Sequence, residues 1–149
     1  MNIIVRKIFL LVLGLASVDC YGLGLELTYD QVFSSHASTI KKIITCGDWS
    51  AGEKSGQFRV IELDLYGQSY LYIDRVAINA DQTAMEVIDG MGIKEFNNDH
   101  ADFSLIKITC RSAGNGIVIK AIAESGHDDS RKKISIEVNA DNMYTMKGF

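Results

Sequence analysis

The chain has 149 residues, of which 47% are hydrophobic, and this composition fits one compact domain with a single core. Its 19 acidic and 15 basic residues give a formal net charge of −4. A mildly acidic protein is a poor ligand for polyanions, so composition argues against nucleic acid as a partner.

The N-terminus has the layout of a secretory signal peptide. Arg6 and Lys7 precede an apolar run over residues 8–18, which is followed by small and polar residues. A helix that spans a bilayer needs about 20 apolar residues, so this run predicts no permanent membrane anchor. We expect residues 1–22 to be cleaved, residues 23–149 to form a single β-rich domain, and the protein to be periplasmic or secreted.

The fate of the three cysteines depends on the cleavage site. Cleavage after Gly22 removes Cys20 and leaves Cys46 and Cys110 as a pair in an oxidising compartment, where we expect them to form a disulfide bond. Cleavage after Ala16 is the alternative, and it would leave Cys20 as an odd thiol suited to an intermolecular bond. A catalytic thiol is a further alternative, because "CGDW" at residues 46–49 resembles the Cys-Gly stretch around the nucleophile of papain-like proteases, but it lacks the second cysteine of that stretch.

The first half of the domain predicts a short helical segment and then strands. Residues 30–44 combine helical spacing with a strand-like end, so we expect a short helix or loop that leads into a strand. In residues 57–80, apolar residues alternate with polar ones, which predicts two half-buried strands that meet at a turn near Gly67. The glycines in residues 84–96 favour two further short strands.

The second half repeats the same alternation in three segments, residues 102–110, 116–124 and 132–138. In the first of these, Ile106, Ile108 and Cys110 would share one face. Short strands separated by polar turns predict a mainly β protein. We expect a single-domain antiparallel β-sandwich or a barrel-like meander, with room for one short N-terminal helix.

Two polar loops supply candidate contact residues for a partner. The segment "NNDHADF" contains Asp99, His100 and Asp102, and the segment "GHDDS" contains His127. Asn and Asp are also ordinary turn residues, because their side chains bond to the nearby backbone. Neither segment has the ligand spacing of a zinc or calcium site, so we predict no metal site here.

Trp49 is the one tryptophan of the chain, and it lies three residues after Cys46 at the start of the segment "SAGEKSG". A rigid loop could present this indole as a partner-binding anchor. The alternative is that Trp49 packs over the disulfide as part of the core.

No catalytic residue or cofactor is predicted, because the sequence contains neither a nucleophile-elbow motif nor a glycine-rich phosphate loop in its proper context. The first hypothesis is an exported binding module that acts on another envelope or secreted protein, as an inhibitor or immunity-type protein does. The second is a carrier of a small apolar ligand, with a cavity lined by Phe58, Tyr70, Tyr72 and Phe103. A hydrolase without a recognisable motif is the third. The sequence leaves the oligomeric state open.

Overall fold

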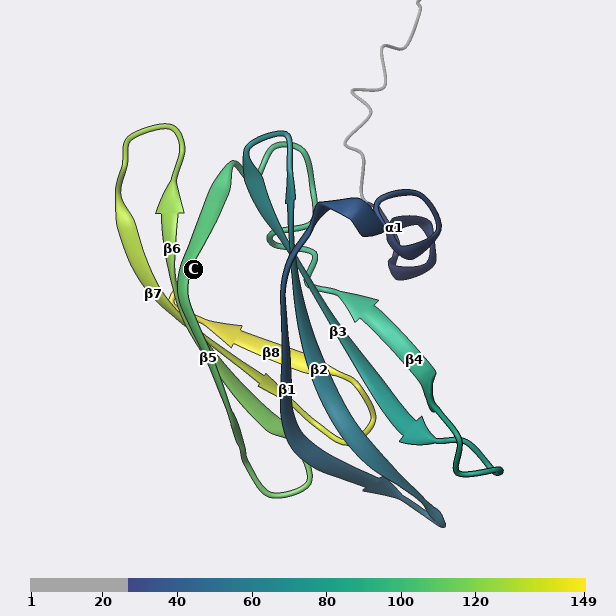
Figure 1. Cartoon of the computed structure of the whole chain (residues 1–149). Helices are drawn as coiled ribbons and strands as arrows, with labels where there is room; N and C mark the ends of the chain where they lie inside the picture. Colours follow the sequence, from purple (N-terminus) through teal and green to yellow (C-terminus); the bar gives the residue numbers. More distant parts are fainter. Residues whose placement is uncertain (1–26) are drawn as a thin grey trace, which may run out of the picture.

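The computed structural model describes residues 27–149, so the predicted signal peptide and Cys20 lie outside the described residues. The described chain forms two four-stranded antiparallel sheets with the orders β1-β2-β3-β4 and β5-β6-β7-β8 (Figure 1). The helices are α1 (Tyr29–Ser35) and the 3-10 turn Ala37–Thr39, and the strands are β1 (Ile40–Ala51), β2 (Lys54–Leu65), β3 (Gln68–Ile78), β4 (Met85–Gly92), β5 (Phe103–Ser112), β6 (Ile117–Ser125), β7 (Arg131–Val138) and β8 (Tyr144–Lys147).

The predicted fold class is confirmed: the protein is mainly β and β-sandwich-like, with one short helix near the N-terminal end of the described chain. Each sheet is a meander of neighbouring strands, and the chain crosses from one sheet to the other between β4 and β5. Within residues 27–149, no helix combines the length and apolar character that crossing a membrane requires.

Helix α1 begins at a capping box, in which Thr28 and Gln31 satisfy each other's backbone N–H groups. The helix buries Val32 completely against the face of the first sheet that points away from the second sheet. Leu27 and the aromatic side chains of Tyr29 and Phe33 complete this helix-side core. The helix is therefore held by tertiary packing, because seven residues form too short a helix to be stable alone.

The helix covers one face of β2 and β3, so these strands are more buried than the half-buried strands that the sequence predicted. Both faces of these strands are covered, one by α1 and the other by the second sheet. As a result Glu62 is 4% exposed and Asp74 is fully buried. Glu62 Oε1 accepts hydrogen bonds from Lys41 (3.1 Å) and Ser69 (2.9 Å), which offset the cost of burying this carboxylate.

Asp74 lies at the border between α1 and the sheet. It accepts hydrogen bonds from the Tyr29 hydroxyl (2.6 Å) and from Arg59 Nε (2.9 Å). A second hydrogen bond, from Arg59 Nη2, makes this ion pair bidentate. Burial and the bond to Asp74 raise the pKa of Tyr29, so its hydroxyl remains a hydrogen-bond donor. The same three side chains anchor the helix to strands β2 and β3.

Two local details of the strands differ from the sequence prediction. Strand β4 is continuous rather than split, and the ring of Tyr29 occupies the space that a side chain at position 90 would need. In β5 the register shifts between Ile106 and Thr109, where Lys107 has a φ of +55°. This bulge places Ile108 in the core and leaves Ile106 outside it, so Ile106 and Ile108 do not share a face.

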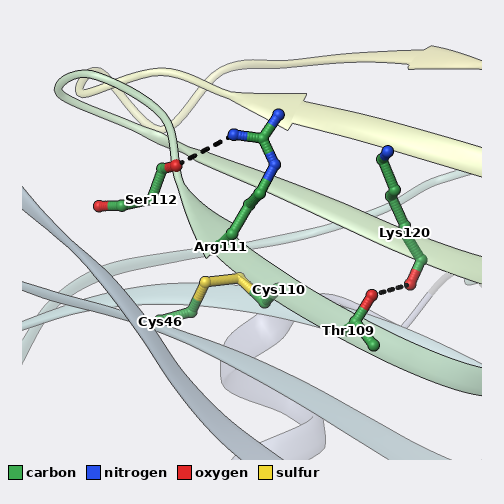
Figure 2. The surroundings of a disulfide bond; sticks show 6 residues. All are labelled: Cys46, Thr109, Cys110, Arg111, Ser112 and Lys120. Carbon is green, nitrogen blue, oxygen red and sulfur yellow. Dashed lines mark hydrogen bonds between the residues drawn. A yellow bond between two sulfur atoms is a disulfide. The ribbon is translucent and has the colours of Figure 1, made fainter.

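The core between the sheets is closed covalently on one side. Cys46 in β1 and Cys110 in β5 form the predicted disulfide, with a Cα–Cα distance of 5.9 Å (Figure 2). Strands β1 and β5 are edge strands of their sheets, so the bond joins two edges across the sandwich. Disulfides persist in oxidising compartments, and this bond is compatible with a stabilised, exported module.

The opposite side of the sandwich is closed by polar contacts. Arg75 of β3 pairs with Asp89 of β4 and donates to the carbonyl oxygen of Ala140 in the turn before β8. The hydroxyl of Tyr144 in β8 donates to Glu95 at 2.7 Å. Both edges of the sandwich are thus tied, one by a covalent bond and the other by hydrogen bonds.

Removal of the disulfide should destabilise the fold without regard to which cysteine is changed. We expect Cys46→Ala and Cys110→Ala to lower the free energy of unfolding by similar amounts, up to about 4 kcal/mol. Either change removes the same cross-link, which in the unfolded chain closes a loop between residues 64 positions apart. The double variant should lose no more than either single one in urea denaturation. Unequal losses would show that one cysteine has a separate role.

The buried carboxylate of Asp74 should also be important for stability. Asp74→Ala leaves Arg59 without its counterion and removes the acceptor of Tyr29, so we expect a loss of about 3–5 kcal/mol. Tyr29→Phe removes one hydrogen bond and should cost about 1 kcal/mol. Chemical denaturation of both variants measures the difference, and equal small losses would contradict the assigned role of the ion pair.

Candidate functional site

The two polar loops that the sequence singled out meet at one end of the molecule. Together with the β2–β3 turn, they line a cleft, here called the end cleft. These three connections lie at the upper end of Figure 1. Its lining residues are Tyr66, Gln68, Tyr70, Asp99, His100, Asp102 and His127. The structure therefore brings together four of the five predicted contact residues, although they come from connections to different sheets.

The loop before β5 is held rigidly against β3. Gln68 donates to the carbonyl oxygen of Asn98 (2.7 Å) and accepts from the backbone N–H of Asp102 (2.8 Å). Asn97 is 1% exposed and exchanges two hydrogen bonds with the backbone of Leu71, at 2.7 and 2.9 Å. Asn97 therefore serves the fold, and it fixes the start of the segment that carries the cleft residues.

The β6–β7 turn is attached to the same loop. The backbone N–H of Gly126 donates to the carbonyl oxygen of Asp102 at 2.7 Å, and His127 Nδ1 lies 3.5 Å from the Asp102 carboxylate. His100 Nε2 lies 3.4 Å from the carboxylate of its neighbour Asp99. Both pairs are solvent-exposed, so they contribute little stability and can exchange for contacts with a ligand.

The cleft thus presents two carboxylates and two imidazoles on a fixed frame. This set can accept hydrogen bonds from a basic group and can donate from the histidines. No group of three or more metal-ligating side chains comes together within residues 27–149. In the same turn as His127, hydrogen bonds from Ser130 lower the pKa of Asp128.

Tyr66 and Gln68 are the cleft residues that the sequence patterns did not indicate, and Tyr66 is the exposed one of the two. Its side chain is 82% exposed, and it occupies the first position of the two-residue turn between β2 and β3. Tyr66 has a φ of +56° and Gly67 a φ of +82°, which is the geometry of a hairpin turn that favours Asn-Gly. The signal was present in the sequence as a bulky aromatic residue directly before the turn glycine.

Trp49 packs in the core, which is the second of the two predicted roles, and it is not an exposed anchor. The residue is 2% exposed and belongs to the core between the sheets together with Cys46. The guanidinium of Arg75 lies 4.8 Å from its ring centre. In this conformation the indole is not available to a partner, and it does not line the end cleft.

The four aromatic residues suggested for an apolar cavity do not enclose one together. Phe58 and Phe103 pack in the core between the sheets, whereas Tyr70 and Tyr72 belong to the core under α1. Phe58 and the two tyrosines project from opposite faces of the first sheet, and Phe103 belongs to β5 of the second sheet. The carrier hypothesis therefore loses the cavity on which it rested.

The fold and the end cleft define a small, disulfide-bonded, β-sandwich-like protein with a polar loop cluster at one end. Comparison with models of protein families, with curated proteins and with solved structures finds no match.

The packing of Trp49 generates a test of its role. We expect Trp49→Ala to lower the free energy of unfolding by about 3–5 kcal/mol, because the change leaves a large cavity in the core. Ile78→Ala, at a side chain that is 63% exposed, is the control and should stay within about 1 kcal/mol of the parent protein. A Trp49 variant as stable as the control would show that the indole does not pack in the core in solution.

Proposed function

We propose that the protein is an exported binding module that uses the end cleft to recognise another envelope or secreted protein, as an inhibitor or immunity-type protein does. The observation that carries this proposal is Tyr66, an exposed aromatic side chain on a residue with a positive φ, a backbone conformation that is unfavourable for tyrosine. Asn or Gly would form the same turn at lower cost. A bulky residue that keeps a strained conformation at an exposed tip indicates a use for the side chain.

Tyrosine is well suited to such a use. Tyr and Trp are enriched among the residues that dominate binding energies, because they bring a large contact area with few rotatable bonds. Beside Tyr66, the carboxylates of Asp99 and Asp102 line the same cleft. This arrangement fits a partner that presents a pocket for the phenol ring next to a basic side chain.

The frame around the cleft supports recognition at little ordering cost. Gln68 and Asn97 fix the loop that carries Asp99 and Asp102, and the β2–β3 hairpin that carries Tyr66 is covered on both faces. A site that is rigid before binding loses less conformational entropy when the partner arrives.

Tyr66→Asn separates the binding role from the folding role. Because asparagine tolerates a positive φ, we expect this variant to melt at the same or a higher temperature than the parent protein. Capture from the envelope extract of the producing organism, followed by mass spectrometry, identifies the partner. The variant should bind the purified partner at least tenfold more weakly, as expected for an aromatic anchor.

Two controls decide the outcome. Ile78→Asn removes an exposed apolar side chain outside the end cleft and should leave the affinity unchanged. Asp102→Asn should weaken binding if a basic side chain enters the cleft. Equal affinity of the parent protein and Tyr66→Asn would overturn the proposal, and a small molecule retained in a native mass spectrum would revive the carrier hypothesis.

A further inference from the structure

The outer face of the β5–β8 sheet, which points away from the first sheet, carries a charge opposite to that of the whole protein. Alternation along the regular parts of the strands, with the bulge residue Lys107 left out, places five basic and two acidic side chains on this face, a formal charge of +3, in a chain whose formal net charge is −4. The two acidic side chains are each paired, Glu124 with Arg131 and Glu137 with Lys147. Three cations remain.

These three cations form a straight diagonal row across the sheet. Arg111 lies opposite Val118 in the register, Lys120 is two residues further along β6, and Lys133 lies opposite Ile122, two residues further again. Diagonal neighbours of this kind are about 7–8 Å apart. Figure 2 shows Arg111 and Lys120 pointing to the same side of the sheet, away from Cys46.

No carboxylate among residues 27–149 forms an ion pair with any of the three. Arg111 donates a weak hydrogen bond to the carbonyl oxygen of its neighbour Ser112, at 3.4 Å, which leaves its charge uncompensated. Hydroxyl groups flank the centre of the row, because Thr109 and Ser135 lie on either side of Lys120 in the register. The face therefore combines aligned cations with hydrogen-bonding groups.

We propose that this row binds an extended acidic polysaccharide, a single narrow chain whose negative charges repeat along one line. Charge complementarity supports this occupant, because carboxylate or sulfate groups along the chain would meet Arg111, Lys120 and Lys133 in turn. The hydroxyls of Thr109 and Ser135 can bond to sugar hydroxyls beside Lys120. This surface lies apart from the end cleft, so the proposal goes beyond the protein-binding function.

Two other polyanions fit the face less well. Single-stranded nucleic acid binds through aromatic platforms, whereas the aromatic residues of this sheet, Phe103 and Tyr144, pack against the core. An anionic bilayer presents its charges over a broad plane, whereas these three cations follow a single diagonal line across the sheet. A narrow chain can run along the row alone.

The test measures affinity for a heparin oligosaccharide and for an oligogalacturonate by titration calorimetry at low salt. The mature parent protein should bind at least one of them, with an affinity that falls as salt rises. Lys120→Gln and Lys133→Gln should each weaken binding roughly two- to fivefold, as expected for the loss of one exposed ionic contact. Lys132→Gln is the matched control, because Lys132 points to the other side of β7, toward the ring of Phe149.

Each result of these titrations either supports or overturns the polysaccharide proposal. Loss in the two row variants with an unchanged Lys132→Gln supports the proposal, and Tyr66→Asn should bind the oligosaccharides like the parent protein. Absence of binding to both oligosaccharides, equal weakening by Lys132→Gln, or tighter binding to oligothymidylate or to phosphatidylglycerol vesicles would overturn it. None of these results bears on partner capture by the end cleft, so the two proposals stand or fall separately.

Discussion

The disulfide between Cys46 and Cys110 is the constraint on which the arrangement of the two sheets depends. Each sheet is a meander that could form from local contacts alone, and the chain passes between the sheets through the β4–β5 connection. The apolar core between the sheets favours face-to-face packing, and the bond adds a covalent tie between two edge strands. Once these edges are joined, Trp49 is enclosed beside the disulfide and Arg75 can reach the turn before β8, which closes the other edge. The end cleft depends on the same constraint, because its walls come from connections to both sheets.

The features of the fold that could be predicted are those encoded within a single strand or turn. Alternation predicted the strands of both halves and the turn near Gly67. The cysteine pair is different, because its bond was predicted from the number of cysteines left in an exported chain and not from a local pattern. The failures arise where a distant segment decides the environment. Asp74 alternates like a solvent-facing residue, but α1 and Arg59 cover it. Ile106 and Ile108 have the spacing of one face, but the bulge at Lys107 separates them. Gly90 suggested a break, yet it is the close approach of Tyr29 that requires a glycine there.

The candidate site shows the same limit. Asp99, His100, Asp102 and His127 were recognisable because polar loops between strands are where binding residues concentrate, but their convergence depends on strand order, which the sequence does not specify. Tyr66 was missed because alternation treats a turn residue as a connector, and its backbone angle is visible only in the structure. Net charge likewise describes the protein as a whole and not each of its surfaces. A total of −4 describes the protein at a distance, whereas strand alternation sorts the charges so that one sheet face is cationic.

The strained position of Tyr66 is sustained by the strands that flank it. A tyrosine with a positive φ costs of the order of 1–3 kcal/mol, and a hairpin that was weakly held would relax into a different turn. Strands β2 and β3 are instead paired in register from Leu65 and Gln68 back to Gln57 and Val76, and both of their faces are buried. A one-residue slip of β2 would exchange the side chains of the two cores, so that Val60 would leave the core between the sheets and Ile61 would leave the core under α1. The register is therefore fixed, and the turn cannot shift. The helix that buries Asp74 and covers Tyr72 thus also maintains the exposed tyrosine at the tip, which links the most buried part of the protein to its candidate site.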